Sequence, residues 1–359
     1  MKRALWLLIP AAATVWAQDT QPENTRRGRI DAKARSRPTY YDQMSQEAIK
    51  RGLTALVKMQ RESGAWTCKV GYKLNEGYHG EDGEHVGVTA LSCMALMASG
   101  NLPDRGEHSK AVAKGLDFVL RSSRPEDGYI TSNGTRMYEH AFATLFLSHA
   151  YGMTQRDDAR QKLKRAVTLL VQAQNPEGGW RYQPQPVDAD LSVTVSTLQA
   201  LRAARAVGIA VPVTTIERAA KYVNDCWTPY GYKYQSSATY MNNDTRVSYA
   251  LTAAGVVSLH SSGHYGEKQL QPAIRRLANY GELAWGRYHY FYGHYYGCQA
   301  LYVHGGEAWE GYYPLLKAEI LRNQRLDGSW VDDVGVTYAT AMACLLLALP
   351  TEAFPIFQK

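Results

Sequence analysis

The sequence predicts an all-α protein, a single α6/α6 toroid in which six helix pairs form a ring. A unit of two helices recurs six times, at spacings of about 45 to 60 residues, with almost no strand-like alternation. The second helix of each unit is far more apolar than the first, which is typical of an inner layer. The last such helix, ATAMACLLLALP, is too apolar to cap an open solenoid, so we expect a closed ring.

Two segments precede the predicted ring. Residues 1–17 join a basic start to a short apolar stretch that ends in small residues, the pattern of a cleaved signal peptide. This pattern predicts an exported protein, either periplasmic or secreted. Residues 18–44 have no apolar periodicity and many arginines, so we expect a basic disordered leader there. The toroid is expected over residues 45–359.

The net charge of +7 belongs mostly to these leading segments. Two of the seven charges lie in residues 1–17 and three in residues 18–40, which leaves the rest at +2. Nucleic-acid binding requires a dense cationic face, so that class of partner is excluded. Beyond the signal no run reaches the roughly 18 apolar residues of a membrane span, so we expect no integral segment in the mature chain. The basic leader suits peripheral contact with an anionic envelope.

Each repeat consists of an amphipathic helix, a turn of Gly-Trp or Gly-Tyr type, a polar loop and the more apolar helix. The turn glycine supplies positive φ, and the aromatic side chain can wedge between repeats. The copies are expected at about residues 45–100, 107–152, 158–208, 214–263, 268–306 and 310–350.

The first three copies show the pattern most clearly. In the first, GLTALVKMQ and VTALSCMALMASG flank a turn at Trp66. In the second, GLDFVLRSS and AFATLFLSHAYG flank a turn at Tyr129. In the third, AVTLLVQAQ and SVTVSTLQALRAARAVG flank a turn at Trp180.

The last three copies keep the pattern with more variation. In the fourth, IERAAKYV and VSYALTAAGVVSLHSSG flank Tyr232, and in the shorter fifth, AIRRLANY and HYYGCQALYVHGG flank Trp285. In the sixth, LLKAEILRNQ and VTYATAMACLLLALP flank Trp330. The inner helices of such an array run parallel, so their starts should meet at one mouth of a central cavity.

An alignment of the copies on their inner helices places one polar residue at each helix start. We expect these six residues at the cavity mouth: His85, His140, Asp190, Asp244, Tyr290 and Asp333. Aspartate is a favoured helix cap, whereas histidine is not, so the histidines are either neutral core residues or acid–base groups. We expect no metal, because no HxxxH or HxxE ligand spacing at these six positions supports one, and no cofactor motif is present.

Segments such as QNPEGGW and RNQRLDGSW resemble the QW-type repeat of squalene and other terpene cyclases and of protein prenyltransferase β-subunits. More closely, the chain resembles exported bacterial proteins, common in planctomycetes, that carry prenyltransferase and squalene oxidase repeats. The matching stretches include GGWRYQP, HYFYGHYYGCQALYVHGGEAW and YATAMACLLLALP. The resemblance implies the toroid fold and an apolar or isoprenoid ligand in a central cavity. It implies no established reaction.

The resemblance also suggests an acid. Class II terpene cyclases carry an Asp-x-Asp-Asp motif at an inner-helix start, and its middle aspartate protonates the substrate. Asp188 and Asp190 match the first two acidic positions, but Leu191 replaces the last. If the protein is catalytic, the resemblance implies Asp190 as the proton donor and Asp188 as its support. The incomplete motif leaves catalysis open.

The fifth repeat is unusually rich in aromatic residues. The residues expected to line the cavity are Tyr288, Tyr292, His294, Tyr295 and Tyr296. Such a surface suits an isoprenoid, a sugar or a cation, and inter-repeat packing is the alternative. Two other functions therefore stay open. A non-catalytic envelope binding or scaffold protein would have a cavity blocked by side chains, whereas a glycan-binding or glycan-hydrolysing toroid requires two carboxylates about 5–10 Å apart.

The five cysteines form an odd, dispersed set and not a disulfide framework. Cys93 and Cys344 lie in apolar helical runs, where cysteine acts as a small core residue. One disulfide among Cys68, Cys226 and Cys298 is left open by the sequence.

Overall fold

Helices alternate between an inner and an outer layer throughout the part of the chain that the computed structural model describes, which is residues 40–71, 80–133, 136–236 and 246–357. The inner helices are α2 (Val86–Ala98), α4 (Met137–Thr154), α6 (Leu191–Ala206), α8 (Tyr249–Ser261), α10 (Tyr290–His304) and α12 (Val336–Ala348). The outer helices are α1 (Gln43–Met59), α3 (Ser109–Arg121), α5 (Asp157–Gln172), α7 (Val213–Asp225), α9 (Leu270–Leu277) and α11 (Gly306–Arg322).

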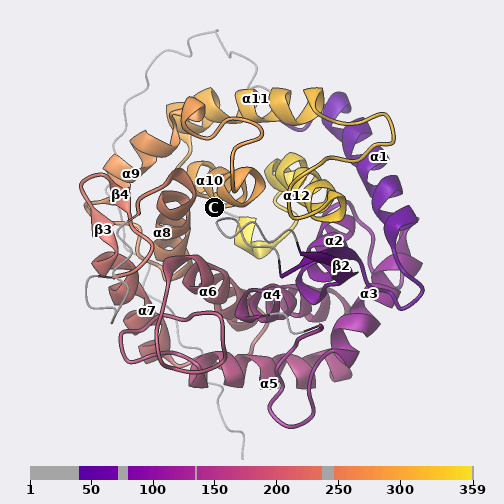
Figure 1. Cartoon of the computed structure of the whole chain (residues 1–359), viewed down its shortest axis with the longest axis horizontal. Helices are drawn as coiled ribbons and strands as arrows, with labels where there is room; N and C mark the ends of the chain where they lie inside the picture. Colours follow the sequence, from indigo (N-terminus) through magenta and orange to yellow (C-terminus); the bar gives the residue numbers. More distant parts are fainter. Residues whose placement is uncertain (1–39, 72–79, 134–135, 237–245, 358–359) are drawn as a thin grey trace, which may run out of the picture. The chain divides into compact units, whose positions relative to one another are not determined.

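The inner helices form a closed ring (Figure 1). Each packs against the next one along the chain, and α12 packs against α2. This arrangement confirms the predicted all-α toroid. Residues 1–39, which contain the predicted signal peptide and most of the predicted leader, lie outside the described residues.

The two layers differ in burial as the sequence pattern predicts. In α2 every residue from Val86 to Met97 is buried, because this helix is covered by neighbours on all sides. The outer helix α7 buries only one face, which includes Ile216, Ala219 and Val223. The inner layer therefore forms the core of the toroid, and the outer layer separates it from water.

A tryptophan fixes the turn between the two helices in three repeats. Trp66, Trp180 and Trp330 are buried, and each indole N–H donates to a carbonyl of the preceding outer helix at 2.6–2.8 Å. The turn glycine Gly178 has a φ of +106°, and a Cβ placed there would lie 2.1 Å from the Arg218 carbonyl oxygen of α7. Only glycine allows so close an approach to the next outer helix.

A glutamine joins each of these repeats to the next one. The side-chain amide of Gln60 donates to Ala111 O of α3 at 2.9 Å, and that of Gln174 donates to Thr215 O of α7 at 2.8 Å. In the last repeat Gln324 donates to Ala48 O of α1 at 2.8 Å. The same contact thus joins the sixth repeat to the first and closes the ring.

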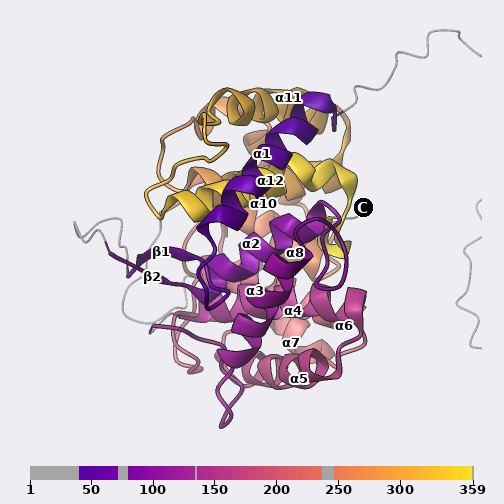
Figure 2. The ribbon, with the colours of Figure 1, turned by 90° about the vertical axis from the view of Figure 1, so that its right-hand side faces the viewer.

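The two ends of the ring are built differently (Figure 2). At the mouth, where the inner helices start, β1 (Thr67–Val70) pairs antiparallel with β2 (Glu81–Glu84), and β3 (Trp227–Thr228) pairs with β4 (Gly231–Tyr232). Three short 3-10 turns complete the described elements: η1 (Tyr280–Glu282), η2 (Leu349–Thr351) and η3 (Pro355–Phe357). At the other end η3 packs against α6 and α10.

Aromatic side chains fill the centre of the ring. Phe354 stacks on His149 at 4.3 Å near the closed end. Tyr295 of α10 lies 6.3 Å from Phe142 of α4, which is the opposite helix of the ring, and Tyr296 packs against Tyr295. Both tyrosines are buried. The centre at this level is therefore packed, and any accessible space lies nearer the mouth.

Within the described part of the chain, no helix combines the length and the apolar character needed to cross a membrane. All five cysteines are buried and unpaired, so the disulfide left open by the sequence is not formed in the structure.

Candidate functional site

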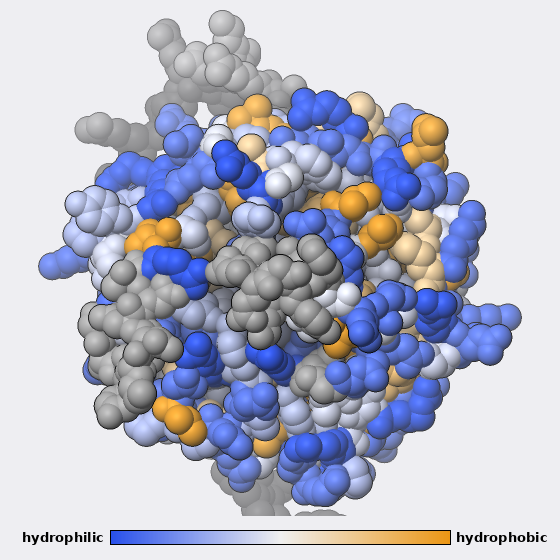
Figure 3. Space-filling model, in the orientation of Figure 1, coloured by the Kyte–Doolittle hydropathy of each residue, from blue (hydrophilic) through white to orange (hydrophobic). Residues whose placement is uncertain are grey.

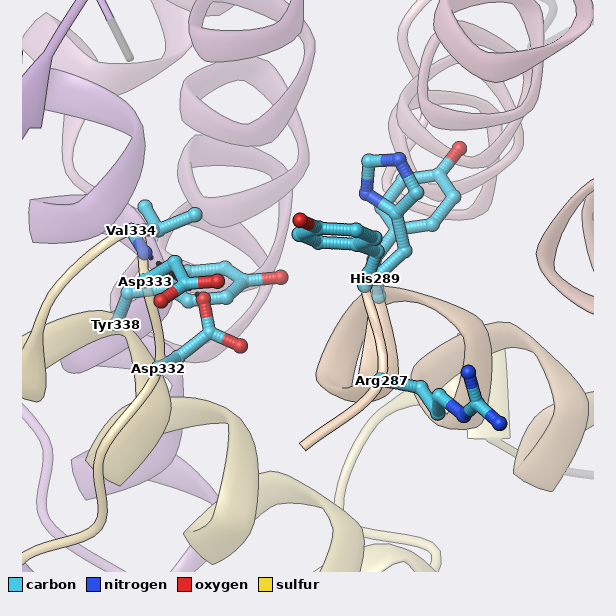
Figure 4. Close-up of a pocket in the computed structure, with 8 residues that line it drawn as sticks. Arg287, His289, Asp332, Asp333, Val334 and Tyr338 are labelled. Atoms are coloured by element: carbon cyan, nitrogen blue, oxygen red, sulfur yellow. Dashed lines mark hydrogen bonds between the residues drawn. The ribbon is translucent and has the colours of Figure 1, made fainter. Parts of the chain in front are cut away.

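A pocket opens at the mouth between the start of α10 and the loop before α12. Its volume is about 40 Å³, and its lining consists of Arg287, Tyr288, His289, Tyr292, Asp332, Asp333, Val334 and Tyr338. The two aspartates and Tyr338 lie on one side of the pocket and His289 on the other (Figure 4). The surrounding face is mostly hydrophilic, with hydrophobic residues only in small separate groups (Figure 3). The lining of the pocket therefore suits a polar group better than an isoprenoid chain.

The two neighbouring carboxyl groups differ in environment. Asp332 is partly buried, and its Oδ1 accepts the Val334 N–H at 2.9 Å. Burial raises the pKa of Asp332, the nearby Asp333 carboxylate raises it further, and the Val334 N–H opposes the shift. Asp333 is exposed. Asp332 thus keeps its proton more readily than an ordinary aspartate, which suits a general acid.

His289 forms the facing wall in an unusual backbone conformation. Its φ of 62° lies in the left-handed region, which costs a residue with a Cβ on the order of 1 kcal/mol. The His289 side chain is exposed, but the surrounding protein desolvates it in part and lowers its pKa, and Arg246 lowers the pKa further, which favours the neutral ring at neutral pH. Tyr292 on the same wall donates its hydroxyl to Ser192 O of α6 at 3.1 Å. Through this bond the pocket adjoins the start of α6.

Asp190 lies at that start and is fully buried. Its Oδ1 accepts the N–H of Val193 at 2.9 Å and the hydroxyl of Ser192. Its Oδ2 has no hydrogen bond of normal geometry among the described residues, and the nearest cation is Arg181, whose Nε is 3.8 Å away. Burial raises the pKa of Asp190 to about 6, although these hydrogen bonds and Arg181 act in the opposite direction. Asp190 is therefore both a helix cap and a partly protonated acid.

Tyrosine hydroxyls surround this acid. Tyr182 and Tyr234 hydrogen-bond each other at 2.6 Å, and burial and the Asp190 carboxylate raise the pKa of both. Tyr138 contacts the hydroxyl of Ser192. The predicted support, Asp188, pairs with Arg181, which also lies near Asp190, so Asp188 acts on Asp190 through this shared arginine.

The two mouth histidines have different partners. His85 caps α2, because its Nδ1 accepts the Val88 N–H at 3.3 Å, while its Nε2 lies 3.0 Å from Glu139. His140 is completely buried, accepts the Ile130 N–H at 3.0 Å and contacts the Ala166 carbonyl at 3.2 Å. Burial lowers the pKa of His140 to about 4. His140 is thus a neutral core histidine that ties a loop to α5 and is not part of the pocket lining.

The remaining predicted residues divide between the centre and the outside of the ring. Tyr290 donates its hydroxyl to Glu319 of α11 at 2.9 Å, so it faces the outer layer. His294 also faces outward: its Nδ1 lies 2.6 Å from the Tyr312 hydroxyl and its Nε2 lies 2.8 Å from a backbone carbonyl. Asp244 lies outside the described residues. Of the predicted residues, the structure brings Asp333, Tyr288 and Tyr292 together in one pocket.

The structure corrects the repeat alignment in two copies. In four repeats a threonine near the start of the inner helix accepts the backbone N–H of the turn aromatic residue. These are Thr89 in the first repeat, Thr194 in the third, Thr252 in the fourth and Thr340 in the sixth. Asp190 lies four residues before Thr194, so its counterparts in the fourth and sixth repeats are Ser248 and Val336, and not Asp244 and Asp333. The alignment slipped by about one helical turn, because an apolar helix looks similar when shifted by three or four residues.

The sequence pattern does not predict the other five residues of the pocket lining, which are Arg287, His289, Asp332, Val334 and Tyr338. An alignment that gives one polar residue per helix start finds Asp333 but not its neighbour Asp332. The consecutive aspartates after the Gly-Ser-Trp turn were the signal that was available. Among the described residues, no group of three or more His, Cys, Asp or Glu side chains is placed to hold a metal ion.

No protein-family model and no curated protein matches the sequence. Solved structures do match. The type II terpene cyclase MstE from Scytonema is 14% identical, with a TM-score of 0.60 over 87% of this chain and 99% of that chain. The GH76A α-1,6-mannanase from Salegentibacter sp. HEL1_6 is 9% identical, with a TM-score of 0.64 over 86% of this chain and 100% of that chain.

At these identities the likeness shows the fold alone, which is the α/α toroid that both kinds of enzyme share. The finer resemblance to prenyltransferase and squalene oxidase repeat proteins stays a prediction.

Proposed function

We propose that the protein binds and hydrolyses a glycan in the pocket between α10 and α12. The observation that carries the proposal is a pair of consecutive carboxyl groups, Asp332 and Asp333, in a pocket lined by Tyr288, Tyr292 and Tyr338. Tyrosine rings stack on sugar faces, and glycoside hydrolysis requires two carboxyl groups. The predicted export of the chain suits an extracellular polysaccharide.

The mannanase neighbour supports this proposal. A variant of that enzyme with two consecutive aspartates replaced by asparagine is inactive and was solved in complex with α-1,6-mannotriose. The present chain carries consecutive aspartates in its own pocket. The first glycan to test is therefore an α-1,6-linked mannooligosaccharide.

The environments of the two carboxyl groups assign their roles. Asp332 has the raised pKa and would protonate the leaving oxygen as the general acid. Asp333 is exposed and would act as the second carboxylate, on water or on the sugar itself. The neutral His289 ring on the facing wall can accept a hydrogen bond from a sugar hydroxyl.

Release of reducing ends from α-1,6-mannotriose and from a panel of polysaccharides would test this function. We expect Asp332→Asn and Asp333→Asn each to reduce the rate by about 100-fold or more. Asp104→Asn is a matched control, because Asp104 is exposed and outside the pocket lining. Release that is unchanged in the double variant, or absent with every glycan of the panel, would rule out hydrolysis at this pocket.

A second candidate function is acid catalysis on an isoprenoid, with Asp190 as the proton donor. The observation that favours it is a fully buried carboxyl group with a pKa of about 6, an Oδ2 without a well-formed hydrogen bond, and surrounding tyrosines. Class II cyclisation requires such a protonated acid. A variant of the cyclase neighbour was solved with geranylgeranyl dihydroxybenzoate as its substrate.

Incubation with linear polyprenoids separates the two candidates. Cyclised product that disappears in Asp190→Asn but persists in Asp332→Asn would support the isoprenoid function. The glycan function predicts the reverse dependence for reducing-end release. Asparagine is also a good helix cap, so Asp190→Asn preserves the start of α6.

A further inference from the structure

Two arginine–tyrosine stacks are joined at the mouth of the ring. The Arg136 Cζ lies 5.1 Å from the centre of the Tyr182 ring. In the same way, the Arg246 Cζ lies 5.6 Å from the centre of the Tyr234 ring. The two tyrosine hydroxyls hydrogen-bond each other at 2.6 Å, and these four residues form an arginine–tyrosine platform. Its rings are partly buried and its arginines are exposed, so a ligand can reach the arginines on a packed base.

The backbone holds the platform in place. The N–H of Met137, the first residue of α4, donates to Tyr182 O at 2.9 Å. The Tyr234 N–H donates to Arg246 O at 3.1 Å, and Tyr234 O accepts the Leu191 N–H at 2.9 Å. The segments before α4, α6 and α8 are therefore tied together. A site that is formed before its ligand arrives loses less freedom on binding.

The charge of Arg136 is not neutralised by a neighbouring carboxylate. Among the described residues, its guanidinium forms no ion pair. Glu139 accepts the Arg136 backbone N–H, but its other oxygen lies 3.0 Å from the His85 ring. Asp188 pairs with Arg181 at 2.5 Å. These two acidic groups thus have other partners, and an unpaired positive charge is left at the platform.

A stacked guanidinium can still bind an anion. The stacking interaction uses the face of the guanidinium plane, whereas the N–H groups point outward within that plane. A carboxylate or a sulfate accepts two of these N–H groups at once, in the paired geometry typical of arginine. The platform is therefore suited to an oxyanion.

The platform adjoins the pocket that holds the two aspartates. Tyr292 of the pocket donates its hydroxyl to Ser192 O at 3.1 Å, and Tyr138 contacts the Ser192 hydroxyl. The Tyr138 ring lies 6.1 Å from the Tyr182 ring of the platform. A glycan of several sugars in the pocket would therefore extend onto the platform.

Another arginine lies in the pocket itself. Arg287 is exposed, and its side chain points away from Asp332 and Asp333 (Figure 4). Within the described part of the chain it forms no ion pair. The acidic and basic groups of the pocket are thus separate, so the aspartates can face the bond between two sugars while an acidic substituent meets an arginine.

We propose that the arginine–tyrosine platform binds the carboxylate of a uronic acid or the sulfate of a sulfated sugar, in a glycan whose next sugar occupies the pocket. The proposal rests on the proposed glycan function and specifies the class of glycan. Arg136 donates two N–H groups to the oxyanion, the stacked Arg246 borders the site, and the tyrosine rings contact the sugar.

Calorimetric titration measures this binding apart from hydrolysis. All proteins carry the Asp332→Asn and Asp333→Asn substitutions, so that no ligand is cleaved. The probes are trigalacturonic acid, sulfated α-1,6-mannotriose and unmodified α-1,6-mannotriose, which separate carboxylate, sulfate and neutral ligands. We expect an acidic probe to bind at least about tenfold more tightly than the neutral one. Equal affinity for all three, or no binding of either acidic probe, would overturn the proposal.

Arg136→Gln in this background tests the platform itself. We expect it to weaken binding of the acidic probe by about tenfold or more and to leave that of mannotriose unchanged. Arg136→Lys keeps the charge but loses the paired N–H geometry, so its loss should be intermediate. Arg160→Gln, at an exposed site of the outer helix α5, is the matched control with no change. An unchanged affinity in Arg136→Gln, or an equal loss for the neutral probe, would refute the role of the platform.

Reducing-end release by the wild type tests the proposed function separately. Release without any preference for an acidic glycan in binding contradicts only the platform. Acidic binding that depends on Arg136, without release from any glycan of the panel, contradicts only hydrolysis.

Discussion

Asp190 is a carboxyl group that the fold removes completely from water. One of its oxygens stabilises the start of α6, which accounts for the residue without any catalysis. The other oxygen is left without a well-formed hydrogen bond, and this is the feature that a cap alone does not require. The pH dependence of stability can show whether the group titrates as its burial predicts.

The raised pKa of Asp190 makes this residue favour the folded state at low pH. Its pKa is about 6 in the folded protein against an ordinary value of 3.8, so the folded state binds the proton more tightly. Relative to Asp190→Asn, the wild type should lose stability as the pH rises from about 4 to 6, by on the order of 2 to 3 kcal/mol. Urea unfolding of both proteins at several pH values measures this difference. A constant difference would show that Asp190 does not titrate in this range.

His140 holds the turn of its own repeat, because its Nδ1 accepts the backbone N–H of Ile130, the residue after the turn aromatic Tyr129. His140→Ala would leave the Ile130 N–H unpaired and create a cavity beside α5, so we expect a loss of roughly 2 to 4 kcal/mol. Chemical denaturation measures the loss. His108→Ala removes a partly exposed ring that makes no side-chain capping bond to α3, so it should change stability by less than about 0.5 kcal/mol. Equal losses in the two variants would contradict the structural role of His140.

The residues of the pocket could be predicted only in part. Asp333, Tyr288 and Tyr292 follow from the repeat alignment and the aromatic run. Asp332 and His289 do not, because their roles depend on a loop and on a left-handed backbone conformation that no periodicity reports. Tyr290 and His294 face the outer layer because their positions on α10 point toward α9 and α11, and composition alone cannot give that direction.

At the scale of elements, three repeats contact the next outer helix in the same way, through a glutamine side chain that donates to a backbone carbonyl. Gln324 bonds both the carbonyl of its own turn and Ala48 of α1. Gln324→Ala would remove two partly buried hydrogen bonds, so we expect a loss of roughly 1 to 3 kcal/mol. Thermal or urea unfolding measures it.

A glutamine outside these contacts provides the control. Gln161 lies on the exposed face of α5, and Gln161→Ala should change stability by at most about 0.5 kcal/mol. If Gln324→Ala were as mild as Gln161→Ala, the ring would not depend on this contact for its closure. The Gly-Trp turns and these glutamines are visible in the sequence, which is why the repeats and their closure could be predicted.

The element scale is also where the sequence alignment failed. Inner helices are apolar all round, so a shift by one turn superposes apolar residues on apolar residues with little penalty. The hydrogen bonds that Thr252 and Thr340 accept from the backbone N–H groups of their turns fix the register. In this register Asp333 precedes the start of α12 and lies in the loop that lines the pocket.

At the scale of the whole molecule, packing of the inner layer buries four histidines in the neutral form. Burial lowers the pKa of all four: His140, His149, His260 and His294. The unfolded chain therefore binds more protons than the folded one between about pH 4 and 6.5, and stability should fall by several kcal/mol as the pH drops through this range. Asp190, Asp332 and, above about pH 6.5, His85 act in the opposite direction but are fewer.

Unfolding midpoints in urea at pH 7.5, 6.0 and 5.0 measure this dependence. A midpoint that is constant or that rises toward pH 5.0 would contradict the neutral state of the buried histidines.

The toroid fold could be predicted from the sequence, but the function of the protein could not. The packed centre around Tyr295 agrees with the blocked cavity that a scaffold protein would have, yet the mouth keeps a pocket with two carboxyl groups. The same ring is found in a cyclase and in a mannanase, so the fold does not choose between their chemistries. The choice depends on a few side chains at the mouth.

The most direct measurement of the central claim is the release of reducing ends from α-1,6-mannotriose and the wider glycan panel by the wild type and by the Asp332→Asn, Asp333→Asn double variant. The account predicts release by the wild type, loss of release in the double variant, and full activity in Asp190→Asn and Asp104→Asn. No release by the wild type from any glycan, or equal release by the double variant, would contradict it.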